Sequence, residues 1–302
     1  MTETTLTNQP STKRPRSVAL MDQFSTFRLE LDQSQAQRER IVKISRDITA
    51  LSKQMIFALH RVASGKPWEQ VKKEVEGKMD QLRGLFAKVR DEVKGGDFWR
   101  YERSISPGLQ EYLEGFTFYH YLQFRTLPTL EQAQASLLAP PSPPSADSIS
   151  ESIEPSAAEV KQETVEPYVV VSAEDYLGGV ADLTGELMRL AIASVGKNLS
   201  SSLQPQKEGQ GEEAESFTDI DRIGRLVREI KGEMDPLAPY ARWLSKKLVV
   251  LDQSLGKIEN ASYNLRIRGA EYKDSPKMLQ ELARKMATSN EGEERGRAEV
   301  VA

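Results

Sequence analysis

Two pairs of carboxylates stand out in the sequence because of their spacing. Glu111 and Glu114 lie three residues apart in "GLQEYLEG", and Asp182 and Glu186 lie four apart in "GGVADLTGEL". In an α-helix these spacings place both members of a pair on one face. Each pair alone is compatible with a solvated helix face. If the two faces meet, however, the four carboxylates cannot all stay ionised at close range unless a divalent cation removes their repulsion.

The chemistry of this residue set favours a cation bound through oxygen. The chain has no cysteine and only two histidines, which argues against thiolate zinc and histidine-rich centres. A carboxylate-bridged di-iron site uses Glu-x-x-His pairs, and neither Glu111 nor Glu114 has a histidine three residues later. Mg²⁺ prefers oxygen ligands and supports attack on a phosphodiester. We therefore expect Mg²⁺, with Mn²⁺ as the alternative.

The glycines Gly178 and Gly179 precede Asp182 inside a segment whose apolar spacing is helical. Each costs a helix about 1 kcal/mol relative to alanine. We expect this cost to be offset by the close approach of another backbone or of a ligand.

Apolar residues recur at spacings of three and four almost throughout the chain, which predicts helices. Proline at Pro107 predicts an irregularity near residues 104–107. The helix expected at residues 244–268 carries leucine heptads and should end before Gly269. No period-two strand pattern is present, so we predict an all-α fold, a helical bundle of about seven helices, at residues 41–60, 67–93, 97–127, 173–197, 217–234, 244–268 and 276–286.

The composition divides the chain into a helical domain and polar segments. We expect a disordered basic tail at residues 1–20, a helical domain at 21–287 and a disordered tail at 288–302. Two acidic insertions, at about 135–170 and 198–216, have little to bury and are also expected to be disordered. No apolar stretch is long enough for a membrane span or a signal peptide, so we expect a cytoplasmic and nuclear protein without membrane contact. The run "KRPR" at 13–16 is either a nuclear address or a chance basic tract.

Three stretches together resemble the translin family, and more closely its translin-associated factor X branch. They read "SISPGLQEYLEGFTFYHYLQFRTL" (104–127), "DYLGGVADLTGELMRLAIASVG" (175–196) and "SKKLVVLDQSLGKIENASYNLRIRGAE" (245–271). The resemblance implies an all-helical subunit that assembles with translin into a closed, barrel-like hetero-octamer cleaving single-stranded RNA. It also implies that Glu111, Glu114 and Asp182 hold Mg²⁺, with Glu186 as a fourth catalytic member.

The resemblance thus implies the function of an Mg²⁺-dependent endoribonuclease subunit, acting in small-RNA or tRNA-fragment processing. Its partners would be a translin-type subunit and single-stranded RNA, with single-stranded DNA as a second ligand. The attacking group would be a water or the ribose 2′-hydroxyl. The alternatives are a non-catalytic nucleic-acid-binding scaffold of the same complex and an unrelated helical adaptor.

Candidate RNA contacts surround "DFWRYERS" at residues 97–104, which interleaves aromatic residues with Arg100 and Arg103. Such a mixture stacks bases and neutralises phosphates in single-strand binders. The competing interpretation makes Trp99 a core residue. Arg189, one turn beyond Glu186, would meet a phosphate or pair with the carboxylates. The charges that flank the leucine heptads, Lys247 among them, are expected to be solvated.

Overall fold

The computed structural model describes residues 18–93, 98–138, 167–201 and 212–271, and these ranges are helical almost throughout. The predicted all-α class is confirmed, since the described residues form no strand beyond an isolated bridge between Leu138 and Pro167. None of the helices in these ranges is long and apolar enough to cross a membrane. The elements are α1 (Val18–His60), α2 (Trp68–Glu92), α3 (Phe98–Phe124), α4 (Leu130–Ala135), α5 (Ala173–Ser201), α6 (Glu212–Met234), the 3₁₀ helix η2 (Asp235–Leu237) and α7 (Leu244–Glu271).

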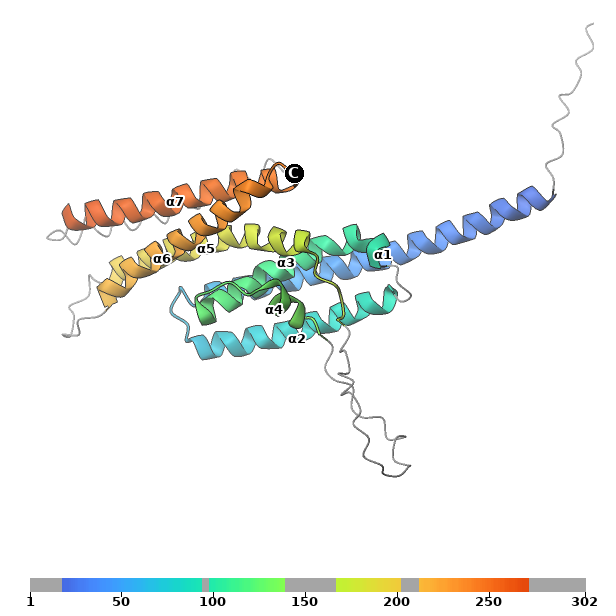
Figure 1. The fold of residues 1–302 in the computed structure, drawn as a ribbon. Coiled ribbons are helices and arrows are strands. Elements are labelled where there is room, and N and C mark those ends of the chain that lie inside the picture. Colours follow the sequence, from blue (N-terminus) through green and yellow to red (C-terminus); the bar gives the residue numbers. More distant parts are fainter. Residues whose placement is uncertain (1–17, 94–97, 139–166, 202–211, 272–302) are drawn as a thin grey trace, which may run out of the picture.

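The long helices form two groups that share one hydrophobic core (Figure 1). Helix α1 packs on α2 and α3, while α5 packs on α6 and α7. The contact between α3 and α5 joins the two groups. These two helices carry the two carboxylate pairs, so the central packing contact of the fold also decides the geometry of the candidate site.

Helix α1 is longer than its apolar pattern predicts. It begins at Val18, far before the first buried residue of its stripe, Ile41. Residues 20–33 are exposed, and Figure 1 shows this part of α1 extending beyond the other helices. The expected start of the helical domain at residue 21 thus lies inside a helix. A pattern based on buried residues could not find this part, because none of the described residues covers it.

Helix α3 runs without interruption through Pro107, so the expected irregularity at residues 104–107 is wrong. Helix α1 supplies polar contacts at this point. The Ser45 hydroxyl donates to the Ile105 carbonyl at 3.3 Å and accepts from the Gly108 N–H at 3.1 Å. A Cβ at Gly108 would lie 2.7 Å from the Ser45 carbonyl oxygen. The glycine beside the proline therefore permits a close helix contact that stabilises the backbone around it.

The short helix α4 was not predicted, although its start carries a signal. Thr129 accepts from the Gln132 N–H at 3.2 Å, and the Gln132 side chain accepts from the Thr129 N–H at 2.8 Å, which is a capping box. Beyond α4, Leu137 and Val169 are buried. The Gln134 amide bonds the Val169 carbonyl at 2.9 Å. The edges of the first expected insertion are therefore packed against the core and joined by this side chain.

Several other expected boundaries also differ. Helix α5 continues to Ser201 and α6 begins at Glu212, so helices enter both ends of the second expected insertion. Helix α7 passes Gly269 and ends at Glu271, since one glycine weakens a helix without having to end it. The predicted helix at 276–286, the "KRPR" run and most of both tails lie outside the described residues.

Candidate functional site

The two glycines of α5 lie where this helix meets α3. A Cβ built on Gly179 would lie 2.7 Å from the Leu113 Cβ and 3.2 Å from the Glu114 nitrogen. A Cβ on Gly178 would lie 2.8 Å from the Gln110 side chain. The expected close approach of another backbone is thus present, because only glycine lets α5 come this close to α3.

This contact brings the two predicted carboxylate pairs together, with Glu111 and Glu114 on α3 and Asp182 and Glu186 on α5. Burial, and after it the charges of Glu186, Glu111 and Asp182, together raise the pKa of Glu114 to about 9. Burial also raises the pKa of Glu111, with contributions from Asp182 and Glu186. Each of the four carboxylates takes part in this mutual repulsion. Near neutral pH, Glu114 therefore holds a proton in the metal-free chain.

Three of the four carboxylates lie beside cationic side chains of the protein. Lys247 of α7 forms an ion pair with Asp182 and donates to the Gly178 carbonyl at 3.2 Å. Lys53 of α1 places its Nζ 3.9 Å from Glu111 Oε2. The expectation that Lys247 is solvated is therefore wrong, since the packing of α7 on α5 directs it into the site.

Glu186 is buried and has two positively charged or polar partners. His60 Nε2 lies 2.5 Å from Glu186 Oε2, and Arg189 Nη1 donates to Glu186 Oε1 at 2.7 Å. Burial alone raises the pKa of Glu186, but His60 and Arg189 outweigh it and bring the pKa below its usual value. The His60 ring is itself fixed against Phe118, with ring centroids 4.9 Å apart. Glu186 is consequently a carboxylate held in one position. Of the two roles expected for Arg189, the structure shows the pairing with a carboxylate.

Glu114 differs from the other three because no cation of the described residues forms an ion pair with it. Its charged neighbours are the three other acids, which raise its pKa, and Lys247, whose charge lowers it without forming an ion pair with Glu114. As the side chains stand, no three acidic or histidine residues of the described ranges are grouped closely enough to hold a metal ion. The donor set still fits a hard divalent cation, because it offers carboxylate oxygens from two helices. Binding would require Glu114 to lose its proton and Lys247 to release Asp182.

Comparison with known proteins identifies the family. The family model described as "Translin family" matches residues 36–269, which is most of the chain. The chain belongs to the translin family. It is 36% identical to Translin-associated protein X of Mus musculus over 255 residues, which cover 84% of this chain and 81% of the mouse protein. It is 25% identical to the Translin-associated protein X homolog of Schizosaccharomyces pombe, over 83% of this chain and 90% of the yeast protein.

Solved structures confirm the fold of this translin-family chain. The structure of apo-NeC3PO matches with a TM-score of 0.52 at 16% identity, covering 80% of this chain and 95% of that one. The structure of AfC3PO in complex with duplex RNA matches with a TM-score of 0.51 at 16% identity, covering 82% and 97%. At this identity the likeness concerns the arrangement of helices.

The predicted RNA contacts at the start of α3 lie apart from the carboxylates. Arg100 and Arg103 are exposed, and Arg100 Nη2 donates to the Ser34 hydroxyl at 2.9 Å. Trp99 is 63% exposed, which contradicts its interpretation as a core residue. Arg103 precedes Glu111 by eight residues, which corresponds to roughly 12 Å along a helix. This end of α3 is thus accessible to a ligand, while its role in binding RNA stays a prediction.

Sequence reasoning missed three residues of the site: Lys53, His60 and Lys247. Lys53 and His60 come from α1 and Lys247 comes from α7. No local spacing connects them to the acids, because they arrive through packing between helices far apart in the sequence.

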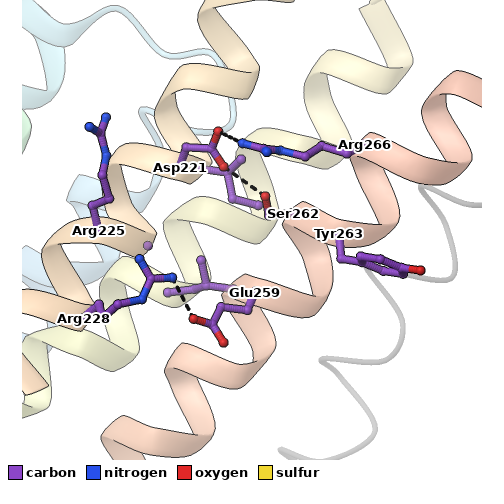
Figure 2. Close-up of a pocket in the computed structure, with 10 residues that line it drawn as sticks. Asp221, Arg225, Arg228, Glu259, Ser262, Tyr263 and Arg266 are labelled. Atoms are coloured by element: carbon purple, nitrogen blue, oxygen red, sulfur yellow. Dashed lines mark hydrogen bonds and ion pairs between the residues drawn. The ribbon is translucent and has the colours of Figure 1, made fainter.

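A polar groove of about 580 Å³ lies between α6 and α7, away from the carboxylate cluster between α3 and α5 (Figure 2). Its two acids are neutralised locally, since Asp221 pairs with Arg266 and Glu259 pairs with Arg228 at 2.7 Å. Figure 2 shows these pairs bridging the two helices. The groove has no group of mutually repelling carboxylates. The cluster between α3 and α5 is accordingly the better candidate for catalysis.

Proposed function

We propose that this chain is the Mg²⁺-dependent catalytic subunit of a translin-type hetero-oligomer that cleaves single-stranded RNA. The observation that carries the proposal is the state of Glu114. No cation of the described residues forms an ion pair with this carboxyl group, three other acids act on it, and its pKa is raised to about 9 chiefly by burial. Strongly perturbed acids of this kind concentrate at functional sites.

The names and titles of the relatives support the partner and the ligand of the proposed complex. The mammalian and yeast relatives are called Translin-associated protein X, which indicates a partner of translin type. One related fold was solved with duplex RNA, which supports nucleic acid as the ligand.

Exposed apolar side chains support a partner subunit. Large exposed apolar patches mark interaction surfaces. Such side chains gather on the extending part of α1 and on the outer face of α7, at Leu20, Met21, Phe24, Phe27, Leu29, Leu31, Val249, Val250, Tyr263 and Ile267.

Each residue of the cluster has a distinct role in the proposed reaction. Glu111, Glu114 and Asp182 would hold Mg²⁺, which supplies charge stabilisation at the phosphate and a lowered pKa for a bound water. Glu186 is held by His60 and Arg189, so it can orient the attacking water or 2′-hydroxyl from a fixed position. Lys247 balances the charge of Asp182 while no metal is present.

The test uses the complex with a translin-type partner, labelled single-stranded RNA, and EDTA as chelator. Glu114→Gln and Asp182→Asn should each abolish the chelator-sensitive cleavage without changing assembly. The control is Glu233→Gln, an exposed glutamate of α6 that should leave cleavage intact. Undiminished cleavage by both site variants would overturn the catalytic assignment.

The second candidate function is a non-catalytic RNA-binding scaffold of the same complex. It is favoured by the absence, among the described residues, of three acids already grouped for a metal. It is also favoured by the protein's own cations at Glu111, Asp182 and Glu186. A wild-type complex that binds RNA but shows no chelator-sensitive cleavage would establish the scaffold function instead.

A further inference from the structure

A basic groove of about 410 Å³ lies between α1 and α2, next to the carboxylate cluster. It is lined by Lys53, Gln54, Phe57, Arg61, Glu74 and Lys78. Lys53 belongs to both features, because its ammonium group reaches Glu111 at 3.9 Å while its side chain is 65% exposed. The groove and the candidate catalytic site therefore share an edge.

The aromatic ring in this groove is unusually exposed for its place in the helix. Phe57 is 71% exposed, whereas its neighbours Ile56 and Ala58 are buried in the core. An apolar ring kept in water brings no gain to the fold of the isolated chain. Such a ring is available to stack on a flat partner, and a nucleic-acid base is one.

The charge of the groove suits a polyanion. It contains three basic side chains and one acid, and that acid, Glu74, is already paired with Arg61 across α1 and α2. Lys78 donates a long hydrogen bond of 3.4 Å to the Gln54 amide oxygen, and its charge also acts on Glu74. Lys53 and Lys78 thus line the groove together with Phe57, the combination of cations and a stacking platform used by single-strand binders.

We infer that single-stranded RNA enters the catalytic cluster along this groove, with one base stacked on Phe57 and its phosphates beside Lys53 and Lys78. The inference rests on the proposed function and names the path of its substrate. Single-stranded RNA fits the groove better than a duplex does, because paired bases keep their faces stacked on one another and cannot reach the ring. The Lys53 ammonium then carries the positive surface up to Glu111, where the phosphodiester would meet the acids.

The test measures RNA affinity in the partner complex carrying Glu114→Gln, so that binding is read without cleavage. Phe57→Ala should weaken the binding of a labelled single strand by roughly 5- to 150-fold, the range for loss of one base–aromatic stack. Lys78→Ala should lower the slope of log affinity against log salt by about 0.7. Tyr240→Ala and Lys43→Ala, which alter exposed residues of the same classes elsewhere, should change neither quantity.

A second measurement locates the RNA directly. Photo-crosslinking of a 4-thiouridine strand, followed by trypsin, should label the peptide Gln54–Arg61, which contains Phe57. Unchanged RNA affinity in the Phe57 and Lys78 variants would overturn the inference. So would a loss of partner assembly without a loss of RNA affinity, because the groove would then be a protein interface. An equal loss for duplex RNA would overturn the stacking role. Because affinity is measured without cleavage, these outcomes are separate from a failure of the nuclease assignment.

Discussion

Replacing Glu114 by glutamine should change how the stability of the chain depends on pH. The pKa of Glu114 is raised from 4.5 to about 9, chiefly by burial and then by three neighbouring carboxylates. Between those two pKa values the folded chain keeps a proton that the unfolded chain has released. The stabilisation from this proton is complete below the unfolded pKa and is lost as the pH rises toward the folded one. Glutamine carries no proton to lose, so Glu114→Gln should remove this dependence.

The expected size of the effect follows from the shift. One proton of difference corresponds to about 1.4 kcal/mol per pH unit. Both pH 6 and pH 8 lie between the two pKa values. As the pH rises from 6 to 8, the free energy of unfolding of the wild type should fall by about 3 kcal/mol relative to that of Glu114→Gln. Groups that titrate in both proteins largely cancel in this difference. Urea denaturation in EDTA at pH 6, 7 and 8, at one protein concentration, measures it.

The exposed residue Glu233 provides the control, since Glu233→Gln should follow the wild type at every pH. Mg²⁺ adds a second reading, because a ligand that binds only the folded state stabilises it by mass action. At pH 8, Mg²⁺ should restore stability to the wild type and have much less effect on Glu114→Gln. If the wild type and Glu114→Gln lose stability in parallel between pH 6 and pH 8, the buried protonated state of Glu114 is refuted.

Three further substitutions test the contact between α3 and α5, the cap of α4 and the charge beside Asp182. Gly179→Ala should destabilise the chain by about 1–3 kcal/mol, because the new methyl group would press on α3. Gly185→Ala is the control and should not destabilise it, since no atom lies within 4 Å of its new methyl group. Thermal denaturation compares the two variants. Thr129→Ala should cost about 1 kcal/mol through loss of the α4 cap and Thr129→Ser much less, as seen in urea denaturation. Lys247→Met should tighten Mg²⁺ binding in calorimetry, because it removes the cation that competes for Asp182; unchanged affinity would show that the lysine does not compete.

The sequence predicted the helices wherever one face of a helix is buried. In α2, the buried residues follow the expected spacing of three and four, at Val71, Val75, Met79, Leu82, Phe86 and Val89. The exposed start of α1 has no such stripe to reveal it. Helix α4 is too short for periodicity, although its capping box was readable at Thr129. The agreement on about seven helices is partly fortuitous, because the expected helix at 276–286 lies outside the described residues and α4 takes its place in the number.

The site was predictable to the extent that its residues share a helix. Spacing places Glu111 beside Glu114, and Asp182 beside Glu186, and Gly179 indicates a close approach. Those features made it reasonable to expect that the two faces meet. The partners of these acids were not predictable in this way, because their positions depend on how α1 and α7 pack against the central helices. A single sequence has no local signal for such contacts.

The unequal charge balance of the cluster bears on whether it is structural or functional. Glu186 and Asp182 have close cationic partners from the protein, and Lys53 approaches Glu111. Glu114 has none in the described part of the chain, although burial is the main cause of its raised pKa. A cluster selected only for stability would gain from an apolar residue at this position, since replacing buried charged groups by well-packed apolar ones is often neutral or stabilising. Retaining an acid there costs stability at neutral and higher pH. That cost is understandable if a cation binds at Glu114 during function, and it is the reason for placing the catalytic metal at this residue.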